Sequence, residues 1–230
     1  MNLVTLISEF ITLLIFLRLL CLERIMYDKI SRDWNRKRKY PWKPFVKYAE
    51  KAMKIWMKKF NHSEKGIQFI DLGAGSGRNA TFFHNFSTRL IEVDISFNML
   101  RINDSKSIKV HCSMQQLPFR DNSFDGVFAV ASIHHITGHV NRQNTIKEIN
   151  RIGKMNALIG LTVWRFYQKK FIKQFIEQLS KPKDTKKHGE IGDVYVPWTI
   201  SQGKQHQTIQ RFYHLFRIHE FNQLIAFIPY

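Results

Sequence analysis

Two spacings of apolar side chains alternate along the chain from Tyr27 onward. A helical spacing begins after Pro44, a residue favoured in the first turn of a helix. Its apolar positions are Phe45, Ala49, Met53, Trp56 and Phe60. Short apolar runs, each of a length suited to a strand, lie at residues 66–72, 89–93, 108–111, 124–131 and 157–164. Because helix-compatible segments separate these runs, the pattern predicts an α/β fold with a mostly parallel sheet.

Apolar stripes at helical spacing flank the last of these runs: Ile146, Ile149 and Ile152 precede it, and Phe171, Phe175 and Leu179 follow it. The next stretch, residues 181–210, is polar, contains Pro and Gly, and is too long for an ordinary connection. It is either a mobile loop or a functional insertion, and we favour an insertion over the site. A last helix is expected at His219–Phe227.

The strongest chemical signal is the sequence FIDLGAGSGRN at Phe69–Asn79, in which an apolar strand runs into three alternate glycines. Glycine permits a tight turn and lets the backbone approach a ligand, because it has no Cβ. The dinucleotide fingerprint G-x-G-x-x-G requires a glycine where Arg78 stands. The loop therefore does not fit a nicotinamide cofactor.

Asp94 follows the second predicted strand, in the sequence IEVDIS. A carboxylate at the tip of that strand is placed to accept hydrogen bonds from both hydroxyls of a ribose. Charge-assisted bonds of this kind are short and strong. An acid at this place after a glycine loop indicates a ligand that contains a nucleoside.

The order D-x-G-x-G-x-G at Asp71–Gly77 resembles motif I of class I S-adenosylmethionine-dependent methyltransferases. LPFRDNSFD at Leu117–Asp125 resembles the stretch before the fourth strand in these enzymes. The resemblance implies a Rossmann-like sheet flanked by helices, and S-adenosyl-L-methionine as the cofactor. The cofactor-binding residues that it implies are Tyr27, Asp71, Gly73, Gly75, Gly77, Asp94, Ile95, Ser113, Met114 and Val130.

Two features depart from the pattern of this family. Ser113 stands where the family usually has an Asp that accepts from the adenine amino group, and a neutral acceptor weakens that bond by about 1 kcal/mol. The family also closes its sheet with a two-strand hairpin after the last helix, whereas the sequence here stops at Tyr230. We therefore expect the C-terminal β-hairpin to be lacking and the fifth strand to be an open edge.

Further segments resemble one subfamily, the tRNA methyltransferases that esterify 5-carboxymethyluridine at the wobble position of the anticodon. They are YDKISRDWNRKRKYPW at 27–42, ASIHHI at 131–136, LTVW at 161–164, DVYVPW at 193–198 and RFYHLF at 211–216. The resemblance implies a small zinc-binding activator protein as a partner, besides tRNA. The residues that it places around the substrate are Arg38, His135, Arg211, Tyr213 and His214.

The chemistry of these side chains suits the binding of a carboxylate and of a base. Arginine forks match a carboxylate bidentately, and Trp164 or Trp198 suits a stacking wall for a base. Two ordinary interpretations stay open: the histidine pair simply ends a strand, and Arg211 and His214 lie on an ordinary surface segment. Adjacent histidines do not have metal-ligand spacing, so no metal site is expected.

The charge of the chain favours a polyanionic partner. Lys and Arg number 36 against 18 Asp and Glu, which gives a formal charge of +18. The basic residues gather in two blocks, Arg32–Lys65 and Arg165–Lys187, which suits surfaces that hold a tRNA stem on either side of a site. A solvated lysine-rich surface is the alternative.

The size and cysteine content add two expectations. The chain of 230 residues provides one well-buried catalytic domain. Only Cys21 and Cys112 are present, which favours a reducing, cytoplasmic compartment. We expect Cys112 to lie close to the cofactor and to serve packing, with a nucleophilic role as the alternative.

The N-terminal segment stands apart from this domain. Leu3–Leu22 is almost continuously apolar and roughly as long as a membrane-spanning helix, yet it contains Glu9 and Arg18. A membrane anchor, an extra helix docked on the domain, and translated upstream sequence before Met26 all stay open. We divide the chain into an apolar segment at 1–25 and a methyltransferase domain at 26–230.

Two other functions stay open beside tRNA methylation. A small-molecule, quinone-type methyltransferase at a membrane accounts for the apolar segment but not for the charge. A truncated, catalytically inactive relative that binds RNA accounts for the charge and for the absent hairpin.

Overall fold

The computed structural model describes residues 24–61, 66–86, 89–172, 176, 189–202 and 205–228. Residues 24–37 form a helix at the start of the described chain. The helices that follow are α2 (Lys43–Lys59), α3 (Ala80–His84), α4 (Phe97–Ile102), α5 (His139–Ile152) and α7 (Ile218–Ile225). The strands are β1 (Gln68–Leu72), β2 (Arg89–Asp94), β3 (Ile108–His111), β4 (Phe124–Val130), β5 (Gly153–Thr162), β6 (Asp193–Gln202) and β7 (Gln205–His214).

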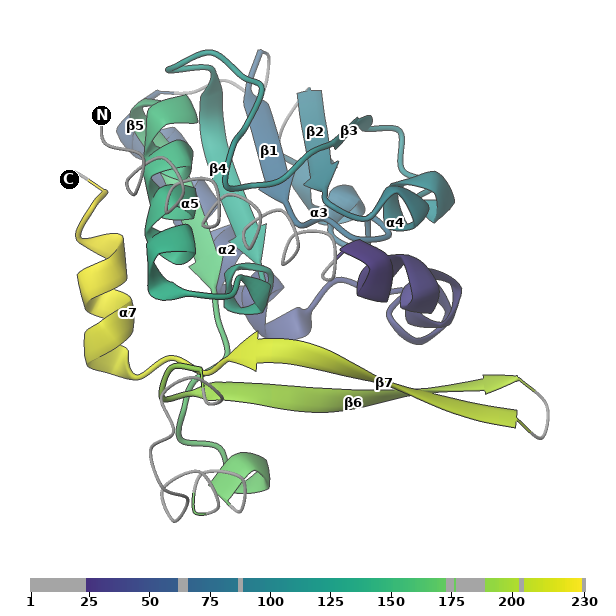
Figure 1. Ribbon diagram of the computed structural model, residues 1–230. Coiled ribbons are helices and arrows are strands. Elements are labelled where there is room, and N and C mark those ends of the chain that lie inside the picture. Colours follow the sequence, from purple (N-terminus) through teal and green to yellow (C-terminus); the bar gives the residue numbers. More distant parts are fainter. Residues whose placement is uncertain are drawn as a thin grey trace, which may run out of the picture.

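The central sheet has five parallel strands in the order β3-β2-β1-β4-β5 (Figure 1). Strand β4 is buried along its whole length, as expected for an inner strand covered on both faces. The α/β fold with a mostly parallel sheet that the alternation of runs predicts is confirmed, and so is the Rossmann-like sheet that the family resemblance implies. The fifth strand begins at Gly153, four residues before the predicted run, because it follows directly on the end of α5 at Ile152.

Helices cover both faces of this sheet, and the pleat of each strand sends alternate side chains to opposite sides. The cluster between the sheet and helices α5 and α7 includes Ile70, Leu72, Ile146, Ile149 and Leu224. The cluster between the sheet and helices α2 and α3 includes Phe45, Trp56, Phe69, Phe83 and Phe128. The predicted apolar stripes of α2 and α5 thus face the core.

Strands β6 and β7 form a separate antiparallel hairpin that runs across the side of the sheet where the parallel strands end (Figure 1). Trp198 Nε1 in β6 donates to Asp33 Oδ2 at 2.8 Å, and Lys37 Nζ donates to the carbonyl of Thr199 at 3.0 Å, so the helix 24–37 holds the hairpin. The boundary expected at residue 210 for the polar insertion falls inside β7. The expected insertion and the RFYH segment are therefore parts of one structural unit.

Strand β5 forms one edge of the five-stranded sheet. Within the described residues the five-stranded sheet ends at β5, and no strand follows α7. The hairpin of this chain precedes that helix instead of following it. The predicted helix at His219–Phe227 corresponds to α7.

Two expectations fall outside the described residues. The segment at 1–25 lies almost wholly before residue 24, so its three interpretations stay as they were. Among the residues that the structure describes, no helix has the length and apolar character that a membrane crossing requires. Most of the basic block Arg165–Lys187, together with Phe175 and Leu179, also lies outside them.

Candidate active site

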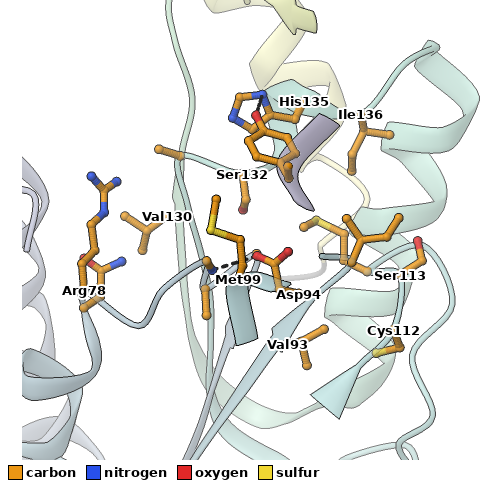
Figure 2. Close-up of a pocket in the computed structure, with 18 of the residues that line it drawn as sticks. Arg78, Val93, Asp94, Met99, Cys112, Ser113, Val130, Ser132, His135 and Ile136 are labelled. Atoms are coloured by element: carbon orange, nitrogen blue, oxygen red, sulfur yellow. Dashed lines mark hydrogen bonds between the residues drawn. The ribbon is translucent and has the colours of Figure 1, made fainter. Parts of the chain in front are cut away.

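A cavity opens at the carboxyl ends of β1, β2 and β4, where the order of the strands reverses (Figure 2). Ligands of open α/β sheets bind in this place, because the loops after neighbouring strands diverge there. Eight of the residues assigned from the sequence to the cofactor line it: Tyr27, Gly73, Gly75, Asp94, Ile95, Ser113, Met114 and Val130.

The glycine loop follows β1 and is held against β2. The amides of Gly73 and Ala74 donate to the carbonyl of Val93 at 2.8 and 2.9 Å. Gly73 has φ +74°, and a Cβ on it would lie 2.5 Å from the Cβ of Ser132, which also lines the cavity. Only glycine lets the loop adopt this conformation and this close approach.

Asp94 ends β2 and is buried at the centre of the cavity wall. Its carboxylate accepts from the amides of Gly75 and Ser96, both at 2.8 Å. Burial raises the pKa of Asp94 to about 6, although these two amides and His111 oppose the shift. The carboxylate is therefore ionised at neutral pH, and the remaining lone pairs of its oxygens can accept from the hydroxyls of a ribose.

Two of the predicted cofactor residues, Asp71 and Gly77, do not line the cavity. Asp71 is buried inside β1, and burial followed by the nearby Glu92 raises its pKa to about 8. Gly77 has φ +77°, and a Cβ there would overlap the side chain of Asn103. In this structure both residues lie behind the loop, and their assignment to cofactor binding stays a prediction.

The far wall of the cavity comes from the segment after β3. Ser113 replaces the usual carboxylate, and its hydroxyl accepts from the amide of Gln115 at 3.2 Å while facing the cavity. Ile95 and Met114 add apolar surface beside it. A carboxylate at the centre, a glycine turn on one side and an apolar wall with a polar group on the other fit a cofactor made of adenine, ribose and methionine.

A second pocket adjoins the first, and Trp34, Arg78, Ala131 and His135 line both. Basic side chains dominate its wall: Lys37, Arg38, Lys39, Lys43, Arg78, Arg165 and Arg211. Aromatic side chains line it as well: Trp34, Tyr40, Trp42, Trp164 and Tyr213. Among the described residues, no Asp or Glu lines this pocket. It therefore suits an anion that carries a planar ring.

Arg211 is the best-fixed cation of this second pocket. It projects from β7, is buried, and donates through Nη1 to the hydroxyl of Tyr213 at 2.6 Å. Its guanidinium lies 4.7 Å from the ring centroid of Trp198 and 5.7 Å from that of Trp34. Arg38 lies over the same two rings, at 5.5 and 5.8 Å. Cation–π contacts thus hold both arginines at one side of the pocket.

The histidine pair lies in η1 (Ile133–His135), directly after β4. Nδ1 of His135 lies 2.9 Å from the hydroxyl of Tyr27 and 3.1 Å from the carbonyl oxygen of Phe212 in β7. His134 stacks on Tyr213, with ring centroids 5.0 Å apart. Burial lowers the pKa of His135 to about 3, with the charge of Arg211 adding to the effect, so this imidazole is neutral at physiological pH.

His214 lines neither of the two pockets, so its assignment to the substrate stays a prediction that no contact here supports. Its ring is buried between two carboxylates: Nδ1 lies 2.7 Å from Asp193 Oδ1, and Nε2 lies 2.5 Å from Glu220 Oε1. Side chains alternate along a strand, so the neighbour of Tyr213 points to the opposite face of the hairpin. His214 thus joins the start of β6 to α7.

Cys112 lines the cofactor cavity, as expected from the sequence. Burial raises the pKa of its thiol to about 11, with the charge of Asp94 adding to the effect. Because the thiolate is the nucleophile, we expect Cys112 to react with iodoacetamide at pH 8 roughly 100-fold more slowly than a free cysteine. A mass-spectrometric time course checks this rate, with N-acetylcysteine as the reference.

The Cys112→Ala variant gives the control for this prediction. We expect this variant to retain methyl-transfer activity, because the Cys112 side chain contributes to packing and not to the reaction. If the variant bound the cofactor normally but transferred no methyl group, a nucleophilic role for Cys112 would be established instead.

Trp34, Ser132 and Arg78 are among the pocket residues that the sequence did not assign to the site. Trp34 and Ser132 lie in segments recognised only as resemblance, and Arg78 was used only to exclude a nicotinamide cofactor. Trp34 lies in the helix 24–37, far from the glycine loop in the sequence, so no local sequence pattern places it at the cavity. The pairing of Trp34 with Trp198, with ring centroids 5.0 Å apart, depends on tertiary structure alone.

The comparisons with known proteins agree with this geometry. Residues 70–160 match the family model described as a methyltransferase domain. The chain is 24% identical over 216 residues to a tRNA (carboxymethyluridine(34)-5-O)-methyltransferase of Schizosaccharomyces pombe, covering 87% of this chain and 84% of that protein. It is 26% identical over 155 residues to a probable tRNA methyltransferase 9B of Bos taurus, of which the match covers only 30%.

Among solved structures, the fold is similar to an S-adenosylmethionine-dependent methyltransferase from Clostridium acetobutylicum. That match has a TM-score of 0.63 at 12% identity and covers 87% of this chain and 86% of the other. The fold, the domain match and the glycine loop with Asp94 agree with one another. Residues 70–160 are therefore a methyltransferase domain, and the chain has the fold of an S-adenosylmethionine-dependent methyltransferase.

Proposed function

We propose that this methyltransferase esterifies the carboxylate of 5-carboxymethyluridine at the wobble position of tRNA. The observation that carries the proposal is the basic and aromatic pocket that adjoins the cofactor cavity and, within the described residues, has no acid in its wall. The names of two relatives, a tRNA carboxymethyluridine methyltransferase and a probable tRNA methyltransferase, support the same substrate class.

The reaction needs no proton transfer. A carboxylate oxygen attacks the methyl carbon of the sulfonium; the new C–O bond forms as the S–C bond breaks, and sulfur keeps the electron pair. The products are a methyl ester and S-adenosylhomocysteine. A carboxylate is already ionised at neutral pH, so the protein has to orient it and exclude water, and orientation can supply roughly 7–11 kcal/mol of the barrier.

The residues of the second pocket suit this orienting work. Arg211 and Arg38 carry fixed positive charge at one side of the pocket, where cation–π contacts limit their movement. Tyr213 lies between Arg211 and His134, and its hydroxyl can hydrogen-bond a second oxygen of the substrate. His135 is neutral and lies at the boundary between the two pockets, so it orients the base without repelling the sulfonium.

The charge outside the pocket supports an RNA substrate. Lys37, Lys39 and Lys43 continue from its wall along the helix 24–37 and into α2, whose exposed side carries further lysines. A cationic surface of this kind neutralises the phosphates of an anticodon stem and gives affinity that falls as salt rises. A flipped base can then enter the aromatic pocket and stack on its walls.

A small zinc-binding activator protein stays part of the proposal. The sheet has two outer strands, β3 and β5, and Ile108 in β3 is 53% exposed. A partner that adds a strand to one of these edges would cover such apolar surface. The assay below is therefore run with and without an activator.

Methyl transfer from labelled S-adenosylmethionine tests the proposal. We expect label in tRNA that carries 5-carboxymethyluridine, in a product that mild base releases because it is an ester. The matched control is the same tRNA with unmodified uridine at the wobble position, which should stay unlabelled. Equal labelling of both RNAs, or label that resists base, would contradict the proposal. Cofactor binding without any transfer to tRNA would indicate a different acceptor.

A further inference from the structure

Arg78 occupies a particular place in the active site, at the junction of the two pockets. It follows the glycine loop and lines both the cofactor cavity and the basic pocket. Figure 2 shows Arg78 and Ser113 on opposite sides of Asp94. If Ser113 faces adenine and Asp94 faces the ribose, Arg78 lies toward the methionine end of the cofactor, from which the methyl group is transferred.

The guanidinium of Arg78 is half-buried and has no carboxylate partner. Among the described residues, no side-chain hydrogen bond or ion pair reaches this guanidinium. The acid whose charge acts on Arg78 is Asp71, which is itself buried; its pKa is raised to about 8, so it neutralises little of the charge at pH 7. A half-buried cation without a partner is costly unless a ligand provides the anion.

Two further cations without acidic partners in the described chain lie in the same place. Arg38 and Arg211 share the rings of Trp34 and Trp198. The positive charges of Arg211, Arg38 and Arg78 all act on the hydroxyl of Tyr213, whose pKa burial raises and these charges lower. Only Arg211 hydrogen-bonds this hydroxyl, but the charge of Arg38 also acts on Arg78. Like charges gathered in one pocket repel one another, which favours an anion among them.

We propose that Arg78 binds the carboxylate of the methyl acceptor at the junction of the two pockets, opposite Arg38 and Arg211. The inference rests on the proposed function and adds the residue that brings the attacking oxygen to the cofactor. The methyl donor also has a carboxylate, but its own ammonium group balances that charge. Arg38, Arg211 and Tyr213 line only the second pocket, so the excess of positive charge lies on the acceptor side.

The test compares Arg78→Gln and Arg78→Lys with a matched control, Arg101→Gln, which removes an exposed arginine of α4 outside both pockets. Binding is measured to two tRNAs that differ in one group, with 5-carboxymethyluridine or its neutral amide, 5-carbamoylmethyluridine, at the wobble position. A charged hydrogen bond contributes roughly 10- to 100-fold in affinity. We expect the wild type to prefer the acid by about tenfold or more on this basis.

In Arg78→Gln this preference should fall to within about twofold, and kcat/KM should fall with it, while Arg78→Lys should restore part of both. Arg101→Gln should weaken both tRNAs alike and keep the preference. Melting temperatures of all variants show whether each is folded. An unchanged preference for the acid in a folded Arg78→Gln protein would overturn the inference.

Cofactor products separate the two sources of carboxylate. S-adenosylhomocysteine has the amino-acid carboxylate, and 5′-methylthioadenosine lacks it. We expect Arg78→Gln to bind both within about threefold of the wild type. A selective loss of S-adenosylhomocysteine binding would assign Arg78 to the cofactor and overturn the inference. If the wild type neither prefers nor methylates the tRNA that carries 5-carboxymethyluridine, the proposed function fails. If the wild type methylates this tRNA and the Arg78→Gln protein methylates it equally well, only the role of Arg78 fails.

Discussion

Replacing Asp94 with alanine is expected to lower the affinity for S-adenosylmethionine by about 100-fold, since each hydrogen bond to a charged acceptor contributes roughly 1.5–3 kcal/mol and the ribose offers two hydroxyls. The same carboxylate also holds the amides of Gly75 and Ser96, so the glycine loop loses an anchor. Isothermal titration calorimetry with S-adenosylmethionine and with S-adenosylhomocysteine measures the loss of affinity.

The pH dependence of cofactor binding gives a second readout of the same residue. Burial raises the pKa of Asp94 to about 6, so the carboxylate takes up a proton as the pH falls through that value. Cofactor affinity should therefore decrease below pH 6 in the wild type. The Asp94→Asn variant keeps the shape of the side chain without its charge and should bind weakly at every pH. An Asp94→Ala protein that binds within about threefold of the wild type would refute the assigned role.

The second large effect is expected on stability, from replacement of His214 with alanine. This change leaves the carboxylates of Asp193 and Glu220 without their imidazole, although both are mostly buried. Breaking a buried pair in this way costs about 3 kcal/mol, which for a chain of this size lowers the melting temperature by roughly 6–12 °C. His219→Ala is the matched control, because His219 is exposed on the same helix, α7.

The sign of the pH dependence follows from the same contacts. Burial lowers the pKa of His214, but the hydrogen bonds with Asp193 and Glu220 outweigh it and raise the pKa above 6.5. The stabilisation is therefore fully present below pH 6.5 and is lost as the pH rises through the folded-state pKa. The pKa of Glu220 is lowered from 4.5, so its contribution is lost only under more acidic conditions.

Urea denaturation of the wild type and of His214→Gln over a pH series measures this difference. The gap in unfolding free energy should be largest between about pH 5 and 6.5 and should shrink at higher pH. Below the unfolding temperature, the folded variant should keep kcat within about threefold of the wild type. A large loss of kcat with unchanged stability would return His214 to the substrate site.

The cofactor half of the site could be predicted from the sequence because its determinants are local. A glycine loop leaves its spacing in the chain, and an acid at the end of the next strand must lie beside it once two parallel strands pair. Gly73 and Asp94 are residues of this kind. Asp71 and Gly77 share the motif, but sequence spacing does not separate a residue that faces the ligand from one that supports the loop.

The acceptor half depends on contacts between distant segments. Trp34 and Trp198 meet only because the hairpin β6–β7 crosses the helix 24–37, as the hydrogen bond between Trp198 and Asp33 illustrates. His214 lies next to Tyr213 in the sequence, and the strand that joins them was not recognised. With β7 known, the alternation of side chains along a strand would have separated the two residues.

The most direct measurement is the identity of the wobble nucleoside after the reaction. tRNA that carries 5-carboxymethyluridine is incubated with the protein and S-adenosylmethionine, with and without a zinc-binding activator protein, then digested to nucleosides and examined by mass spectrometry. We predict that the acid disappears and that its methyl ester appears in equal amount, in a reaction that fails with Asp94→Ala. A methyl group on any other nucleoside, or an unchanged 5-carboxymethyluridine beside a protein that binds the cofactor, would contradict the account.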